Sequence, residues 1–257
     1  MTTAPILYLG DTTLRSAAAY LAGVMTHAGW TFAYTPSDQS APESLFNQPF
    51  QLVILSDYPA KNLTPQAQAR LLARVQAGAG LLMIGGWESY TGVGGDWGPT
   101  SVGAALPVQM QDHDDRVNCD QPTLIHCRLD HPITAGLPWV DRPPTIGGFN
   151  RFTAKPEAQT LLEAQRFAAS RTGAGFTFKP LSADALLVVG THGQGRTTAL
   201  ATDVAPHWVG GLVDWGSDSG GGPPGRVSAQ APHAEAIEVG DHYAQFFRQL
   251  LQWTGKL

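Results

Sequence analysis

The chain has 257 residues, of which 43% are hydrophobic and only 14% charged, and its formal net charge is −5. This composition supplies a sizeable core and argues against disorder over most of the length. The 16 Lys and Arg residues are scattered and are outnumbered by 21 Asp and Glu, so we expect no nucleic acid partner. No apolar run approaches the roughly 18 residues of a membrane span. Because residues 1–5 also carry no secretory-signal pattern, we expect a cytoplasmic protein with no membrane partner.

Four short apolar runs in the first third of the chain are expected as strands: residues 5–10, 30–34, 51–56 and 80–84. A helix is expected at 17–28, with Asp11, Thr12 and Thr13 as capping side chains ahead of it. A second helix is expected to begin at Thr64 and Pro65 and to end at Gly78. Strands that alternate with helices at this rhythm predict right-handed βαβ units on a parallel sheet.

The rest of the chain is less regular. Residues 85–107 form a Gly-rich loop with a short helix expected at 99–105, and long ordered loops tend to be functional. Residues 131–138 are expected as a turn with a short helical piece. The Gly-, Ser- and Pro-rich insertion at 209–240 is expected as an irregular, solvated loop, the alternative being a flexible lid. The remaining expected elements are strands at 107–111, 123–129, 159–164, 185–189 and 197–202 and a terminal helix at 242–253.

The last two of these strands are joined through Gly193 and Gly195, which predicts a hairpin and therefore an antiparallel edge on a mixed sheet. The whole chain, residues 1–257, is expected to form a single domain, because open α/β sheets of this size often carry such insertions.

The cysteines give little chemistry. Cys119 and Cys127 are too few for a disulfide framework and lack the paired spacing of a zinc site, so both are expected as structural thiols. The segment 112–115, Asp-His-Asp-Asp, resembles a metal cluster only in composition and is expected as a solvated acidic loop. We therefore expect no metal and no cofactor.

Polar side chains that follow the strands select a candidate site, because ligands of open parallel sheets bind beyond the carboxyl ends of the strands, where the strand order reverses. Asp11 follows the first strand, and Asp57 and Tyr58 follow the third. The remaining candidates follow the fourth strand and the strand at 197–202: Gly85, Gly86, Trp87, Glu88, Asp203 and His207.

Several of these residues have a structural alternative. Asp11 is either a ligand contact or a helix cap, and Asp57 either a ligand contact or the organiser of a turn. Glu88, beside Trp87, is the strongest candidate for an acid or base, since a desolvated carboxylate has a raised pKa. Asp203 lies four residues before His207 and can orient its imidazole as a catalytic pair, the alternative being a structural histidine.

The order and spacing of several motifs resemble the putative glutamine amidotransferase family, a branch of the class I glutamine amidotransferase-like superfamily that also includes ThuA-like proteins. The motifs are Gly85–Tyr90, Leu106–Val108, His131–Pro138, Gly148–Arg151 and Ala199–Trp208, followed by the terminal helix. The resemblance covers nearly the whole chain. It implies a flavodoxin-like α/β fold, with a doubly wound, mostly parallel sheet and an antiparallel edge.

The resemblance also bears on the reaction. Active class I amidotransferases place a nucleophilic cysteine on an elbow after the fourth strand, with a later histidine and glutamate that activate it. At that elbow this chain has Gly85, Gly86, Trp87 and Glu88, so the nucleophile is missing. His207 falls where the catalytic histidine of the superfamily would lie, but Trp208 follows it in place of a His-Pro-Glu run. We therefore do not expect an active glutaminase.

Three functional hypotheses remain open. The first is an amidotransferase-like domain that binds a small polar molecule, sugar-like in kind, against Trp87. The second is a hydrolase or isomerase that needs no cysteine and uses Glu88 or His207 as the general base. The third is a homo-oligomeric assembly module that buries Trp97, Trp208 or Trp215 at its interface, since aromatic residues are favoured interface anchors.

Overall fold

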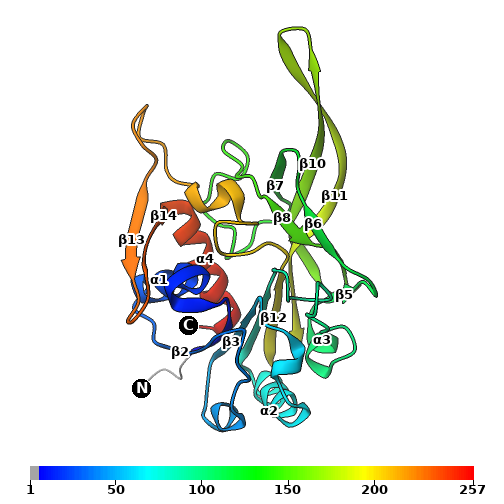
Figure 1. Cartoon of the computed structure of the whole chain (residues 1–257), viewed down its shortest axis with the longest axis vertical. Coiled ribbons are helices and arrows are strands. Elements are labelled where there is room, and N and C mark those ends of the chain that lie inside the picture. Colours follow the sequence, from blue (N-terminus) through cyan, green and yellow to red (C-terminus); the bar gives the residue numbers. More distant parts are fainter. Residues whose placement is uncertain (1–5) are drawn as a thin grey trace.

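An eight-stranded sheet forms the centre of the computed structural model, which describes residues 6–257 (Figure 1). The strand order is β2-β1-β3-β4-β12-β11-β10-β7. Five neighbouring strands are parallel: β2 (Phe32–Thr35), β1 (Ile6–Gly10), β3 (Leu52–Ser56), β4 (Gly80–Ile84) and β12 (Gly195–Leu200). With β12 in fifth place, these strands follow the flavodoxin-like order 2-1-3-4-5.

An antiparallel edge completes the sheet. It consists of β11 (Gly175–His192), β10 (Gln159–Thr172) and β7 (Thr123–Cys127), each antiparallel to its neighbour. The predicted fold class is thereby confirmed: a doubly wound, mostly parallel sheet with an antiparallel edge. The hairpin predicted at Gly193 and Gly195 is the connection between β11 and β12.

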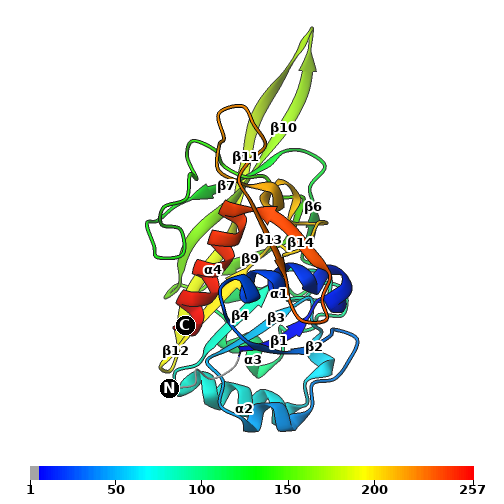
Figure 2. The same cartoon turned by 90° about the vertical axis from the view of Figure 1, so that its left-hand side faces the viewer.

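Helices cover both faces of the sheet, which explains why β1, β3 and β4 are buried along their whole length and show no polar alternation. On one face lie α1 (Ala18–His27) and α4 (Asp241–Gly255), and on the other α2 (Pro65–Gln76) and α3 (Ser101–Ala105) (Figure 2). α2 begins as predicted, because the hydroxyl of Thr64 accepts a hydrogen bond from the backbone N–H of Ala67 at 3.1 Å. None of the helices in residues 6–257 is long and apolar enough to cross a membrane.

Of the three side chains predicted to cap the first helix, only that of Thr13 accepts a backbone N–H ahead of it, from Arg15 at 3.1 Å. A short helical turn over Thr13–Ala17 precedes α1, and Thr12 at its start makes no side-chain capping bond. The backbone N–H of Thr13 instead donates to the hydroxyl of Ser16 at 2.6 Å. The carboxylate of Asp11 accepts from the hydroxyl of Tyr8 at 2.6 Å, so it is held at the end of β1 rather than over the helix. Pro5, predicted as the first strand residue, lies outside the described residues.

Two hairpins replace expected loops or short strands. The insertion at 209–240 was expected as an irregular loop, but it contains a hairpin of β13 (Arg226–Gln230) and β14 (Ala236–Gly240). This hairpin packs on α1, where the side chain of Ile237 fills the space beside Gly23. β10 and β11 are far longer than predicted, and they form a two-stranded arm, residues 166–182, that projects from the body (Figures 1 and 2).

Short elements fill the connections. β5 (Val108–Met110) pairs with β9 (Phe152–Ala154), and β6 (Arg116–Asn118) pairs with β8 (Gly148–Asn150). Helical turns lie at Glu43–Asn47, Ala60–Asn62 and Gly210–Asp214. Residues 131–138 form turns without the short helix that was expected.

Candidate functional site

The carboxyl ends of the parallel strands share one edge of the sheet, which we call the crevice, and β1 and β3 lie at the point where the strand order reverses and where open α/β sheets bind ligands. Asp11 directly follows β1 and Asp57 directly follows β3. Both have left-handed backbones, with φ of 42° and 47°, a conformation that costs Asp less than most residues. The backbone N–H of Asp11 donates to the carbonyl of Ser56 at 2.9 Å, which ties the two strand ends together.

Asp11, Asp57 and Asp203 are close enough to affect one another's titration. Burial, and then the charges of Asp203 and Asp57, raise the pKa of Asp11 well above its usual range. Burial, followed by the charge of Asp57, raises the pKa of Asp203 to about 7. These three residues, which we call the carboxylate cluster, therefore hold protons at a pH where most aspartates are ionised.

Three tyrosines, of which Tyr8 and Tyr243 are fully buried, hold the cluster in place. The hydroxyl of Tyr8 donates to the Asp11 carboxylate, and the hydroxyl of Tyr34 donates to the Asp11 carbonyl at 2.6 Å. The hydroxyl of Tyr243, on α4, donates to the carbonyl of Val204 at 2.6 Å and fixes the segment that carries Asp203. Burial and then the Asp11 charge raise the pKa of Tyr34, as burial and then the Asp203 charge raise that of Tyr243, so both stay protonated donors.

The elbow after β4 depends on two glycines because other chain segments approach it closely. A Cβ on Gly85 would overlap the carbonyl oxygen of Ala201. A Cβ on Gly86 would lie 2.6 Å from the carboxylate of Asp57. Only glycine permits such an approach. This gives both residues a packing role, and their contact with a ligand stays a prediction.

A clamp that the sequence did not reveal holds this elbow. The side chain of the fully buried Asn150 accepts from the N–H of Gly86 at 2.9 Å and donates to the Gly86 carbonyl at 3.1 Å. It also donates at 2.8 Å to the carboxylate of Asp115, which accepts from the N–H groups of Thr91 and Gly92 at 3.0 Å each. We call Asn150 and Asp115 the elbow clamp.

The clamp corrects one prediction and explains one motif. Asp115 was expected in a solvated acidic loop, but its side chain is buried because it satisfies two backbone N–H groups and an amide. Asn150 belongs to the motif Gly148–Arg151, and this was the only feature of the sequence that could have marked it as important to the site. That signal gave no indication that Asn150 reaches Gly86.

Trp87, Glu88 and His207 surround Asp57 at the mouth of the crevice. The N–H of Glu88 donates to the Asp57 carboxylate at 2.5 Å. Burial is the main cause that raises the pKa of Asp57, and the backbone N–H groups of Glu88 and Trp87 and the charge of His207 act against it. Burial, and then the charge of Asp57, also raise the pKa of Glu88.

Trp87 presents an aromatic surface at this mouth. It is 46% exposed, the guanidinium of Arg116 lies 4.4 Å from the centre of its ring, and the ring of His207 lies 6.0 Å away. The predicted site residues Trp87, Glu88, His207 and Asp57 are therefore brought together.

Two predicted roles do not fit the geometry. Asp203 accepts from the N–H groups of Val204 and Ala205 at 2.5 and 3.4 Å, and no hydrogen bond within the described residues joins it to His207. Asp57, rather than Asp203, is therefore the carboxylate whose titration responds to His207. The ring of Tyr58 is buried, and its hydroxyl accepts from the N–H of Ala41 and donates to the carbonyl of Gln39, both at 2.9 Å. Tyr58 thus holds the connector before β3 and has no free group for a ligand.

The chain matches the family model described as putative glutamine amidotransferase over residues 11–219. It belongs to this family. Two cytoplasmic proteins of Salmonella typhimurium have similar solved structures, one with 24% identity, a TM-score of 0.71 and coverage of 97% of this chain and 99% of that one. The other has 21% identity, a TM-score of 0.69 and coverage of 97% and 98%.

ThuA-like proteins are also among the structural relatives of this amidotransferase-like chain. One from Parabacteroides merdae has 12% identity and a TM-score of 0.59, and the match covers 99% of this chain and 90% of that one. At these identities the similarity shows the fold. The resemblance stated from the motifs is thereby confirmed. A comparison with curated proteins gave no significant match.

For a member of the glutamine amidotransferase family, the positions of the cysteines matter most. Cys119 follows β6 and Cys127 ends β7, whereas β4 continues into Gly85 and Gly86. Burial raises the pKa of the Cys119 thiol, which disfavours a thiolate nucleophile. Among the described residues, no group of three His, Cys, Asp or Glu side chains is arranged to hold a metal ion.

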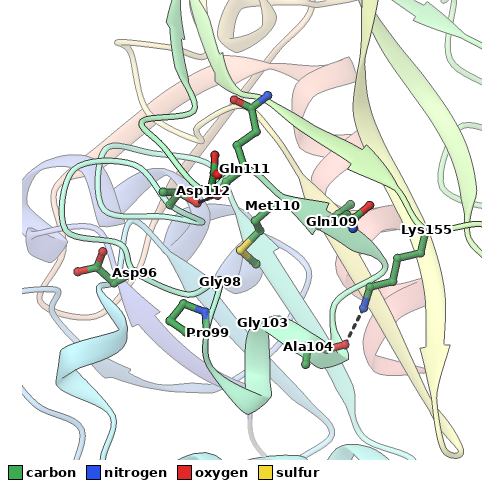
Figure 3. A pocket seen from close by; sticks show the side chains of 12 residues that line it. Asp96, Gly98, Pro99, Gly103, Ala104, Gln109, Met110, Gln111, Asp112 and Lys155 are labelled. Atoms are coloured by element: carbon green, nitrogen blue, oxygen red, sulfur yellow. Dashed lines mark hydrogen bonds between the residues drawn. The ribbon is translucent and has the colours of Figure 1, made fainter.

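A separate cavity of ≈ 660 Å³ lies between the Gly-rich loop and β5 (Figure 3). Its rim includes Lys155, whose ammonium donates to the carbonyl of Ala104 at 2.6 Å and so closes the loop against β9. It shares Thr91 with the bonds of the elbow clamp, but none of the site residues predicted from sequence lines it. The carboxylate cluster and Trp87 therefore define the candidate site.

Proposed function

We propose that this member of the glutamine amidotransferase family binds a small ligand rich in hydroxyl groups, such as a sugar, in the crevice and does not hydrolyse glutamine. One observation carries the proposal. Three carboxylates from separate strand ends gather beside an exposed Trp87, at an elbow whose residues are glycines rather than cysteine. A thioester intermediate requires a thiolate within reach of a base.

The chemistry of the cluster suits hydroxyl groups. A hydroxyl donates one hydrogen bond and accepts two, and partly protonated carboxyl groups both donate and accept. The pKa of Asp203, about 7, keeps such a mixture of protonation states near neutral pH, and burial also raises the pKa of Asp11. The exposed ring of Trp87 offers a flat apolar surface to the C–H face of a sugar ring.

Trp87 also supplies the readout for the test. It is the one tryptophan of the seven with a largely exposed side chain, so a ligand packed on it changes fluorescence from that ring. We expect titration with a panel of neutral monosaccharides and sugar acids to give a saturable change for at least one of them. Trp87→Phe should remove the signal. Asp57→Asn, which keeps the acceptor for the Glu88 N–H, should weaken binding.

Release of ammonia from glutamine by the purified protein, lost on Cys119→Ala or Cys127→Ala, would contradict the proposal. A panel without any saturable response, measured by fluorescence and by thermal shift, would count equally against a sugar-like ligand.

A second candidate function is a hydrolase or isomerase that needs no cysteine. The observation that favours it is the pKa of Asp203 near 7, because a general acid or base works best when its pKa lies near the working pH. Glu88 and His207 border the same cluster through Asp57. The test is turnover of any ligand that the panel reveals. Activity that survives both Asp203→Asn and the combination of Glu88→Gln with His207→Ala rules this candidate out.

A further inference from the structure

The arm, residues 166–182, has one apolar and one polar face. In its antiparallel register Arg171 faces Phe176, Ala169 faces Phe178 and Phe167 faces Pro180. Directly paired residues lie on the same face of a ribbon, and alternate residues along each strand share that face. The opposite face carries the pairs Ser170 with Thr177 and Ala168 with Lys179.

The apolar face of the arm is not covered by the rest of the described chain. Phe176 is 66% and Phe178 56% exposed, and every residue from 170 to 183 is exposed. Contacts with Gln121 and Pro122 brace only the base of the arm, through the N–H groups of Ala169 and Phe167. An isolated two-stranded ribbon is marginally stable in water, and exposed apolar patches mark interaction sites.

A groove of ≈ 600 Å³ lies at the same edge of the sheet, where β7 ends and the turns at 128–141 begin. Its apolar lining includes Leu129, 46% exposed, and Val140, 88% exposed. Because β7 pairs with β10, the groove and the arm both adjoin this edge.

The charges of the arm and the groove are complementary. Between Arg166 and Ser182 the arm contains Arg171 and Lys179 and no acidic residue. The groove contains Asp130 and Asp141, and neither forms an ion pair within residues 6–257. The one basic side chain of the groove, Arg128, is already paired with Glu163 at 3.5 Å. A basic, aromatic ribbon therefore fits an acidic, apolar groove.

We propose that the arm of each copy of this chain lies in the groove of a second copy, which gives a two-fold symmetric dimer. A two-fold axis brings the same patch of both subunits together, and here one patch contains both the ribbon and its receptor. Phe176 and Phe178 are the anchors, and Arg171, which shares their face, lies against Asp130 and Asp141. This proposal corrects the anchors expected from sequence, since Trp97, Trp208 and Trp215 are all buried in the core.

The first test is the mass of the protein in solution, by analytical ultracentrifugation from about 1 to about 100 µM. We expect a dimer, and we expect Phe176→Ser with Phe178→Ser to raise its dissociation constant at least about 100-fold, as for central aromatic anchors. Val93→Ser is the matched control, because Val93 is equally exposed but lies in the Gly-rich loop. A monomer at every concentration, or a dimer that survives the double substitution, overturns the proposal.

A charge exchange tests the groove. Arg171→Glu should weaken the dimer, and so should Asp130→Lys with Asp141→Lys. When the two variants are mixed, both contacts of a heterodimer are again of opposite charge, so a mixed dimer should form. Failure to form it, with both variants folded by circular dichroism, overturns the docking of the arm in this groove.

Discussion

The crevice and the arm are stabilised in opposite ways. In the crevice, buried polar groups such as Asn150 and Asp11 are each held by several hydrogen bonds from distant segments. In the arm, the backbone ladder between β10 and β11 is the main interaction, and the side chains lie in solvent. Substitutions in the crevice should therefore change the free energy of unfolding, whereas substitutions in the arm should change association.

The largest expected effect is that of Asn150→Ala. It leaves the buried N–H of Gly86 without a partner, and it leaves the Gly86 carbonyl with only a long bond from the Ser89 N–H at 3.5 Å. It also removes one of the three hydrogen bonds that the Asp115 carboxylate accepts. An unsatisfied buried group costs about 1–3 kcal/mol and a lost hydrogen bond to a charged group about 1.5–3 kcal/mol, so we expect a loss of about 3–5 kcal/mol in the free energy of unfolding by urea. Asn47→Ala, at an exposed position, should cost less than about 0.5 kcal/mol. Equal costs for the two would show that the elbow clamp is not a main support.

The second prediction concerns pH. The pKa of Asp203 is about 7 in the folded protein and about 3.9 in the unfolded chain, so between these values only the folded state holds the proton. The stability contributed by this group is full below pH 4 or so and is lost as the pH rises through about 7. Asp203→Asn removes this titration and keeps the acceptor for the Val204 N–H.

We therefore expect Asp203→Asn to be more stable than the unaltered protein at pH 8, by about 2–4 kcal/mol, and to differ little from it near pH 4. Urea unfolding at the two pH values measures this. Asp218→Asn, on the exposed surface, should show no such pH dependence. The idea of a protonated cluster fails if the two variants behave alike.

Sequence reasoning found the parts of the fold whose signals are local. The buried strands are apolar runs, Thr64 and Pro65 mark the start of α2, and the end of each parallel strand points to a crevice residue. The elbow clamp was missed because Asn150 contacts Gly86 across a long stretch of sequence, and no local pattern records that contact.

The arm was missed for a different reason. The alternation of Phe176 and Phe178 with Thr177 and Lys179 is that of a strand, but no long apolar run accompanies it because neither face is buried in the chain's own core. A strand pattern without a core to explain it is itself a signal of an external contact.

The third prediction concerns Arg116, whose removal should have a smaller effect. Arg116→Ala removes the guanidinium above the Trp87 ring and its bonds to Asp114, both near the surface. A cation–π contact at an exposed site is worth about 0.5–1 kcal/mol, so we expect a loss of that order and a shift in Trp87 fluorescence. Arg15→Ala, an exposed arginine whose side chain makes no bond among the described residues, should leave both unchanged.

The smallest expected effect is that of Phe176→Ala on unfolding, measured at a concentration where the chain is monomeric. It should change the free energy of unfolding by less than about 0.5 kcal/mol, because the side chain is in solvent. The matched change of the buried Phe149→Ala should cost about 3–5 kcal/mol. A cost at Phe176 near that of Phe149 would mean that the arm packs on its own body.

The late position of β12 in the sequence affects how the sheet folds during synthesis. β12 pairs with β4, Leu200 beside Ile84, so the strand that completes the crevice is made long after β1, β3 and β4. During synthesis the half-sheet emerges with the backbone groups of β4 unpaired along one edge, which is a site for wrong pairing. Pairing of β12 with β4 is expected to be slow, because the long chain between them must first bring the two strands together. We therefore expect an interval during synthesis in which Asp11 and Asp57 are already made but Asp203 is not, and in which the edge of β4 is most open to wrong pairing.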